Sequence, residues 1–441
     1  MSQAAELLLP FVPSAAEPFD LRRAGHLARR VAFGLPLGER ERLTRLTPQE
    51  AVARVVSAAG GEDLADLVED VIATETLERA QAWRVWRLLR GRQRLAERMS
   101  LFWHGHFATS QRKVQDLAAM CRQQQLFDRL GTGAFDALLL AIAKDPAMLR
   151  WLDGANNKKG RANENFAREL FERFALGRGA YAEKDVQEAA RAFTGYALRD
   201  GAFHFVAAWH DAGSKQVLGG EGPLGGDDVI ALALRHPAHA PFLARKLLQL
   251  FVHPEPTPDE VAAVAEAYRQ HGRDVGKTCV QLLGSRLFFS ARAYRSRVKA
   301  PADWCLGLVR SCAASAAPTA LARMLATLGQ SLLEPPSVEG WHEERAWLTS
   351  ATWLLRANAA ADLFMARRDT KFAPSAAAIL EPARNAEARA DLALRLLLDG
   401  DVSAAARARV RAFAQGPAAA GPDGAAALLH AVALLPEAQL L

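Results

Sequence analysis

The sequence predicts a mainly α-helical protein, a large multi-helical body with a small β-hairpin insertion near residues 196–218. Apolar residues recur at helical spacing through most of the chain, as they do every four residues between 166 and 174. Alanine is abundant in these periodic segments and β-branched residues are sparse, a composition that favours helix. Only residues 202–209 and 215–218 have the pattern of short strands, joined by HDAGS, so we expect one hairpin to interrupt the helices.

The chain divides into an arm, a main body and a C-terminal segment. Residues 1–20 are a proline-punctuated arm, residues 21–366 the main helical domain, and residues 367–441 an alanine-rich helical segment packed on it. Thr47 and Pro48 mark a helix start, since threonine caps a helix and proline suits its first turn. The helical stretches expected in the main body span residues 20–31, 39–56, 76–103, 113–130, 134–144, 163–196 (a helix pair around a glycine-rich turn), 227–235, 238–252, 259–271, 275–284, 300–314, 319–328 and 346–366.

Composition is that of an ordinary globular protein and narrows the classes of partner. Of 441 residues, 50% are hydrophobic and 24% are charged. The net charge of +6 comes mostly from arginines that alternate with glutamates, so nucleic acid is not expected as a partner. The four cysteines are too irregularly spaced for a disulfide framework or a zinc knuckle, and we expect buried free thiols.

No basic region precedes the short apolar run at the N-terminus, and no stretch reaches the ~18 apolar residues of a membrane span. We therefore expect a cytoplasmic location.

The segment WHGHF carries the first candidate site, His104 and His106. Neutral imidazole is the commonest metal ligand among side chains. On a helix, residues two apart point in nearly opposite directions, so joint ligation requires the chain to open at Gly105. The neighbours Trp103 and Phe107 equally support packed, hydrogen-bonded histidines at a helix end.

The adjacent pair His210 and Asp211 is the second candidate. It is similar to the His–Asp pair that bridges metals in helical phosphohydrolases, but here it precedes a glycine turn after a strand. Lys215 follows closely and would serve an anionic group. The alternative is that Asp211 forms and caps a turn.

Charged residues alternate in the helix that begins near Asn163. Glu164, Arg168 and Glu172 recur every four residues, and Glu169 is offset from them. Paired carboxylates bind metal or divide acid and base roles when their environments differ. An ion-pair network explains the same pattern, with Asn163 as a helix cap. Only the first turn of this helix is expected to form a pocket wall.

The loop EPPSVEGWHEERAW is the fourth candidate. Pro335 and Pro336 fix an extended segment, Gly340 permits a turn, and Trp341 anchors the loop. Loop residues often carry function, and His342 is an added candidate, yet a rigid plug that closes a helical core explains the loop equally well. The sequence contains no GxSxG, Walker, HExxH or post-strand GxGxxG motif, which removes the common serine-hydrolase, nucleotide and zinc-protease classes.

Five segments in a fixed order carry a resemblance to a known family. They are ERMSLFWHGHFATS (97–110), RANENFARELFERFALGRGAYAEKDVQEAARAFTGY (161–196), WHDAGSKQVLG (209–219), RSRVKAPADW (295–304) and LGQSLLEPPSVEGW (328–341) with the tryptophan-containing helix after it. Their order and spacing, over about residues 20–366, resemble the bacterial DUF1800 family, whose members have no established biochemical function.

The resemblance implies a mostly helical fold and suggests a partner protein of the DUF1501 family, because genes of the two families often lie side by side. The DUF1501 proteins resemble sulfatases and phosphatases. Many DUF1800 members carry an export signal, which we do not expect in this chain. Many also carry histidine where this chain has Phe174, so a ligand role at that position is not general.

The leading hypothesis from the sequence is an enzyme, with hydrolase-type chemistry favoured, whose polar pocket is formed by the HGH, NEN and HD segments. Its candidate catalytic residues are His104, His106, Glu164, Arg168, His210, Asp211 and Lys215. A divalent metal ion is the cofactor considered, with His104, His106, Glu164 and His210 as its ligands. The alternative is a helical scaffold or accessory subunit that binds a partner protein.

Overall fold

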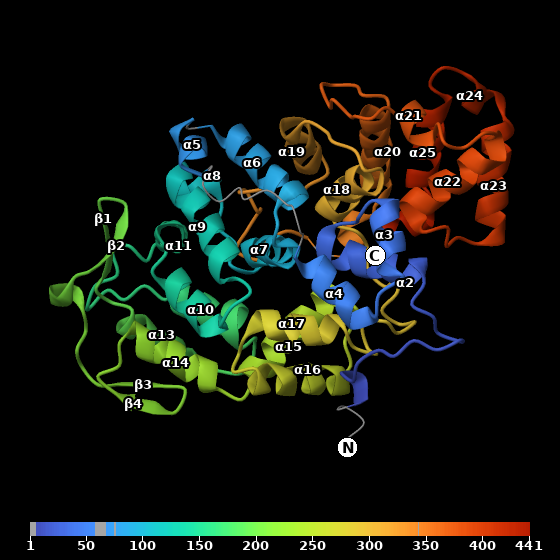
Figure 1. The fold of residues 1–441 in the computed structure, drawn as a ribbon. Helices are drawn as coiled ribbons and strands as arrows, with labels where there is room; N and C mark the ends of the chain where they lie inside the picture. Colours follow the sequence, from blue (N-terminus) through green and yellow to red (C-terminus); the bar gives the residue numbers. More distant parts are fainter. Residues whose placement is uncertain (1–5, 58–67, 75, 343) are drawn as a thin grey trace.

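Helices form almost all of the regular structure, as predicted. The computed structural model describes residues 6–57, 68–74, 76–342 and 344–441. Within these residues, two small antiparallel sheets accompany the helices (Figure 1). The prediction of a mainly α fold with a small β insertion is thereby confirmed. No helix in this described part of the chain is long and apolar enough to cross a membrane.

The first half of the helical body extends from α2 to α11. The predicted helix over residues 39–56 is two helices, because the capping box of Thr47 and Glu50 and the first-turn Pro48 begin a new one. The helices of this half are α2 (Leu21–Ala32), α3 (Leu37–Leu43), α4 (Pro48–Val56), α5 (Val68–Ala73), α6 (Leu77–Arg90), α7 (Arg94–His106), α8 (Gln111–Val114), α9 (Leu117–Leu130), α10 (Phe135–Ala143) and α11 (Pro146–Trp151).

The predicted helix pair over 163–196 is present, but its first helix changes type. Helix α12 (Asn165–Glu169) continues into a π-helical turn over Leu170–Ala175, and α13 (Glu183–Ala192) follows. In this wider turn the N–H of Leu176 reaches back five residues to the carbonyl of Phe171, at 3.1 Å. The carbonyl groups at the end of the turn are left without partners in the helix and bond to side chains from elsewhere.

Two hairpins follow α13. Strand β1 (Tyr196–Arg199) pairs with β2 (Ala202–Phe205), and β3 (Lys215–Val217) pairs with β4 (Gly220–Gly222). The insertion is where the sequence placed it, but the predicted pairing of the strand at 202–209 with the strand at 215–218 is wrong.

The turn between β1 and β2 explains the difference. Asp200 and Gly201 occupy it with φ angles of 53° and 75°. A two-residue turn with both φ angles positive matches the twist of a hairpin, and an Asp-Gly pair is its strongest short sequence signal. That pair directs residues 202–205 back onto β1.

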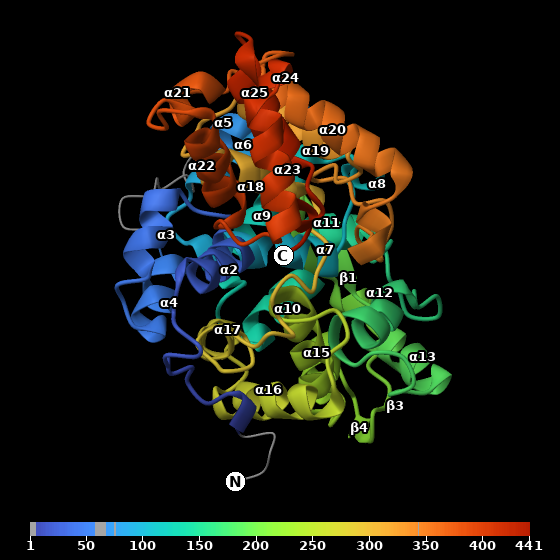
Figure 2. The ribbon, with the colours of Figure 1, turned by 90° about the vertical axis from the view of Figure 1, so that its right-hand side faces the viewer.

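The second half of the body is again helical. Its helices are α14 (Gly226–Arg235), α15 (His239–Phe251), α16 (Pro258–Gln270), α17 (Val275–Leu283), α18 (Pro301–Ser311), α19 (Pro318–Thr327), α20 (Ser350–Phe364), α21 (Ala376–Leu380), α22 (Ala386–Leu398), α23 (Ala404–Gln415), α24 (Pro417–Ala420) and α25 (Gly424–Ala433), with short 3-10 turns at Ala207–Trp209, Glu344–Trp347 and Pro436–Gln439. Figure 2 shows α20 to α25 gathered at one end of the molecule and β3 and β4 at the other.

Two large clusters of buried side chains form the core, and α7 lies where they meet. The first contains most buried apolar residues up to Ala293, including Phe11 and Phe19 of the N-terminal arm. The second joins α18 and α19 to the C-terminal helices. Trp103 of α7 belongs to the first cluster, whereas Leu101 packs against the second. The end of α7 is therefore bordered by both halves of the molecule.

Candidate functional site

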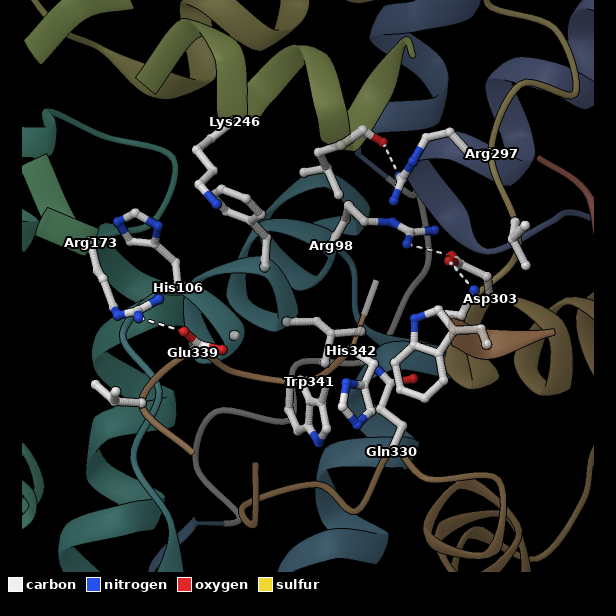
Figure 3. A pocket seen from close by; sticks show the side chains of 18 of the residues that line it. Arg98, His106, Arg173, Lys246, Arg297, Asp303, Gln330, Glu339, Trp341 and His342 are labelled. Atoms are coloured by element: carbon white, nitrogen blue, oxygen red, sulfur yellow. Dashed lines mark hydrogen bonds and ion pairs between the residues drawn. The ribbon is translucent and has the colours of Figure 1, made fainter. Parts of the chain in front are cut away.

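A polar cavity of about 230 Å³ lies beside the end of α7, between α15 and the loop that precedes α20. Figure 3 shows Lys246 and Arg297 pointing into it from one side, with Trp341 and His342 on the other. We call it the α7–α15 cavity. Its charged lining residues are Arg98, Glu172, Arg173, Lys246, Arg297, Asp303 and Glu339. Among the seven catalytic candidates from the sequence, His106 alone lines this cavity.

The π-helical turn fixes the ring of His106. The ring nitrogen Nε2 lies 3.2 Å from the carbonyl oxygen of Phe174, an oxygen that can only accept. Nε2 therefore carries the proton, and Nδ1 of the neutral ring is an acceptor. Phe102 stacks on the ring at a centroid distance of 5.8 Å, and Phe242 lies at 6.2 Å. Burial and the charge of Lys246 together lower the pKa of His106 well below its usual value.

The charges around the cavity are neutralised with one exception. Three arginines each bind a carboxylate: Arg98 with Asp303, Arg173 with Glu339, and Arg297 with Glu344. Lys246, half-buried on α15, makes no ion pair or hydrogen bond within the part of the chain that the structure describes. An ammonium group in such a place favours a bound anion.

Residues 337–342 and 344–347 form a strap along one side of the cavity. Gly340 has a φ of 82°, and a Cβ there would lie 2.4 Å from the carbonyl oxygen of Gly105, so glycine is required for the close approach. The next residue, Trp341, packs edge-on against His104 at 4.9 Å. The ion pairs of Glu339 and Glu344 hold the strap to the opposite wall.

His104 points away from the cavity. Because α7 remains helical through Gly105, His104 and His106 project to different sides. Nε2 of His104 accepts a hydrogen bond from the N–H of Leu333 at 3.0 Å. The side chain is buried, and this burial lowers its pKa to about 3. His104 thus supports the loop behind the strap as a neutral acceptor.

The HD segment forms a self-contained turn. Nδ1 of His210 donates to a backbone carbonyl at 2.8 Å. The carboxylate of Asp211 binds Arg191 at 2.8 Å and the N–H of Gly213 at 3.0 Å. The ion pair with Arg191 lowers the pKa of Asp211 to about 2. Buried Lys215 donates to the carbonyls of Asp211 and Gly213. Every charged group of this turn has a local partner.

The NEN segment is likewise engaged in local bonds. Arg168 binds Glu164 at 2.9 Å and also Glu183. Oδ1 of Asn163 accepts from the N–H of Asn165 at 2.8 Å in a turn just before α12, but the N-cap position of α12 is Glu164 and not the predicted Asn163. The other two carboxylates are also paired: Glu172 with Arg178 and Glu169 with Arg173.

The structure does not gather the ligand set expected from the sequence, His104, His106, Glu164 and His210. Within the described ranges, no three His, Cys, Asp or Glu side chains form a group that could hold a metal ion. Helical geometry separates the two histidines of α7, and the other two residues make local bonds. The donor atoms of the described residues thus do not fit a divalent metal, and of the three segments only HGH contributes lining residues to the α7–α15 cavity.

Several cavity residues were not recognised as a site from the sequence. Arg297 and Asp303 lie in RSRVKAPADW, a segment that supported the family resemblance but was given no role. Lys246 and Phe242 lie in a regular amphipathic helix, where a lysine is normally solvated. No local signal distinguishes Lys246, because the cavity exists only once α15 packs beside α7.

The chain was compared with curated proteins, solved structures and family models. No curated protein and no solved structure matches the chain. One family model, described as a protein of unknown function (DUF1800), matches residues 26–440, a longer span than the quoted motifs cover. The chain therefore belongs to the DUF1800 family.

Proposed function

We propose that the protein is an enzyme that binds a small molecule in the α7–α15 cavity, with hydrolase-type proton transfer at His106. The observation that carries the proposal is the fixed tautomer of His106. Its Nε2 is held by the Phe174 carbonyl, which leaves Nδ1 unprotonated in an aromatic-walled cavity. A neutral imidazole in this state can accept a proton from a water molecule or a substrate hydroxyl group, and because burial and Lys246 lower its pKa it is a weaker base than a free histidine.

The setting of the cavity also supports this function. Ligand sites are concave, mostly apolar, and carry a few placed polar groups. Here Phe102 and Phe242 form apolar walls. The polar atoms are Nδ1 of His106 and Nζ of Lys246, which make no hydrogen bond to another described residue. The HGH segment thus contributes one catalytic group, and the NEN and HD segments support the surrounding fold.

A hydrolysis assay tests the proposal. We expect the wild type to hydrolyse at least one of 4-nitrophenyl acetate, butyrate and phosphate above the buffer rate. His106→Gln should remove this activity, because glutamine keeps a donor for the Phe174 carbonyl but cannot take up a proton. The matched control is His204→Gln, since His204 is exposed on β2 and outside the cavity.

Two results would overturn the proposal. One is equal turnover by the wild type and His106→Gln, which would remove His106 from the reaction. The other is no turnover of any ester together with no change in tryptophan fluorescence on titration with the same compounds, because Trp341 and Trp347 line the cavity.

A further inference from the structure

We infer that the ligand of the α7–α15 cavity is a compact organic anion, with its anionic group at Lys246 and an apolar body between the aromatic side chains. This inference rests on the proposed function, because it names the substrate class of the same site. It follows from the charge balance, the apolar walls and the size of the cavity.

Charge balance is the first argument. Each arginine that lines the cavity already binds a carboxylate, so a ligand would have to displace an internal partner to reach it. Displacement at Arg98 or Arg297 leaves a mostly buried carboxylate unpaired, which is costly. Arg173 has a second carboxylate partner in Glu169. Lys246 carries the one lining charge that has no counter-charge in the described residues. An anion bound there gains the full charge-assisted hydrogen bond without breaking any pair.

The position of Lys246 relative to the aromatic rings is the second argument. Phe242 lies one helical turn before Lys246 on α15, so the two side chains share a face of that helix. The ring centroid of Phe242 in turn lies 6.2 Å from that of His106, and Phe102 stacks on the same histidine ring at 5.8 Å. Figure 3 shows Lys246 extending towards His106. A ligand anchored at Lys246 therefore places its body against aromatic surface and next to Nδ1 of His106.

Size is the third argument. A volume of about 230 Å³ is below the roughly 300–1,000 Å³ typical of drug-sized ligand sites. An inorganic anion would leave the aromatic walls uncovered, and a long chain would not fit inside. A single ring or short branched chain with one carboxylate or phosphate group suits both limits.

Calorimetric titration with matched probes tests the inference. Benzoate and benzamide have nearly the same shape and differ in charge, and phenylphosphonate separates a phosphonate from a carboxylate preference. We expect benzoate or phenylphosphonate to bind the wild type at least tenfold more tightly than benzamide. Lys246→Met should weaken the anion by about tenfold or more and leave benzamide unchanged, since a hydrogen bond to a charged group is lost. Lys246→Arg should recover part of the affinity.

Two controls identify the site. Arg245→Met alters the preceding residue of α15, which is exposed and outside the cavity lining, and should leave all affinities unchanged. Gly105→Phe should abolish binding of every probe. Gly105 lines the cavity, and a Cβ there meets only Trp341, at 3.7 Å, so we expect a phenyl ring at this position to occupy the space that the probes need.

The outcomes separate this inference from the proposed function. If benzoate, phenylphosphonate and benzamide bind equally, or Lys246→Met leaves the anions unaffected, while Gly105→Phe abolishes binding, the cavity is a ligand site but its ligand is not an anion held by Lys246. If no probe binds, or Gly105→Phe changes nothing, the ligand site itself is overturned and the inference falls with it.

Discussion

Two polar regions of this molecule have similar composition and opposite bonding. The HD turn and the α7–α15 cavity each bring together lysine, arginine, carboxylate and histidine side chains. In the turn, Lys215 donates to two backbone carbonyls and Asp211 binds Arg191. In the cavity, Lys246 has no partner among the described residues, and Nδ1 of His106 is an open acceptor. A charged cluster whose bonds are complete stabilises the fold, whereas one with bonds left over is available to a ligand.

The difference follows from how each region is built. The HD turn is closed by residues within 25 positions of each other, so short loops can satisfy every donor. The cavity is bordered by α7, α15 and the strap, which are far apart in sequence. Rigid helices approach one another at distances set by their large side chains, and polar groups between them need not meet. The polar residues of the HD turn therefore stabilise the fold locally.

The largest loss of stability is expected for Lys215→Met in the HD turn. The buried ammonium group is replaced by a thioether, and the carbonyls of Asp211 and Gly213 lose their donor. Hydrogen bonds to a charged group contribute roughly 1.5–3 kcal/mol, so the free energy of unfolding should fall by about 2–3 kcal/mol. Urea denaturation measures it.

Lys371→Met is the control for this substitution. Lys371 is exposed, and the change there should alter the free energy of unfolding by less than about 0.5 kcal/mol. Equal stability of Lys215→Met and the wild type would show that the HD turn does not depend on its lysine.

A smaller effect is expected in the pH dependence of stability through His104. Its folded pKa of about 3 lies below the unfolded value of about 6.5, so between these values the unfolded state binds more protons. The stability associated with neutral His104 is present above pH 6.5 and is lost as the pH falls towards 3. Over the 1.5 units from pH 6.5 to pH 5 the loss is about 2 kcal/mol, at 1.36 kcal/mol per unit.

His104→Gln isolates this contribution, since glutamine still offers an acceptor to the N–H of Leu333. The difference in unfolding free energy between wild type and variant should shift by about 2 kcal/mol in favour of the variant between pH 7 and pH 5. Buried Asp145, whose pKa burial raises to about 7, acts in the opposite direction but is common to both proteins and cancels. A difference that stays constant with pH would show that His104 is protonated without cost and not sealed in the core.

The fold was largely predictable because its signals are local and repeated. The spacing of Phe166, Leu170 and Phe174 predicted a buried helical face, and these residues are 6%, 0% and 0% exposed. Their spacing did not reveal the π-helical turn, which depends on a hydrogen bond from Leu176 to Phe171. The strand pairing was missed although Asp200 and Gly201 contained the signal for it.

The site was less predictable because its two main features depend on long-range packing. The sequence identified His106 as a candidate, but it could not show that the Phe174 carbonyl would fix the tautomer. Likewise, no pattern in α15 distinguishes Lys246 from a solvated lysine. By contrast, the polar motifs that stand out in the sequence are His210-Asp211 and Asn163-Glu164. In the structure they make bonds to residues nearby in the chain and do not line the cavity.

The smallest effect on stability is expected for Lys246→Met, and it is the matched counterpart of Lys215→Met. The substitution removes no hydrogen bond or ion pair to a described residue. Methionine is nearly as long as lysine, so it still covers the face of α15 that it shares with Phe242. The free energy of unfolding should therefore change by less than about 0.5 kcal/mol. A loss above 1 kcal/mol in urea denaturation would mean that Lys246 holds the fold together as Lys215 does, and the distinction between the two regions would fail. If Lys246→Met is stable but binds the anion more weakly, the function of this lysine is to bind the ligand. A residue that adds charge to a cavity without adding to stability is explained by what the cavity binds.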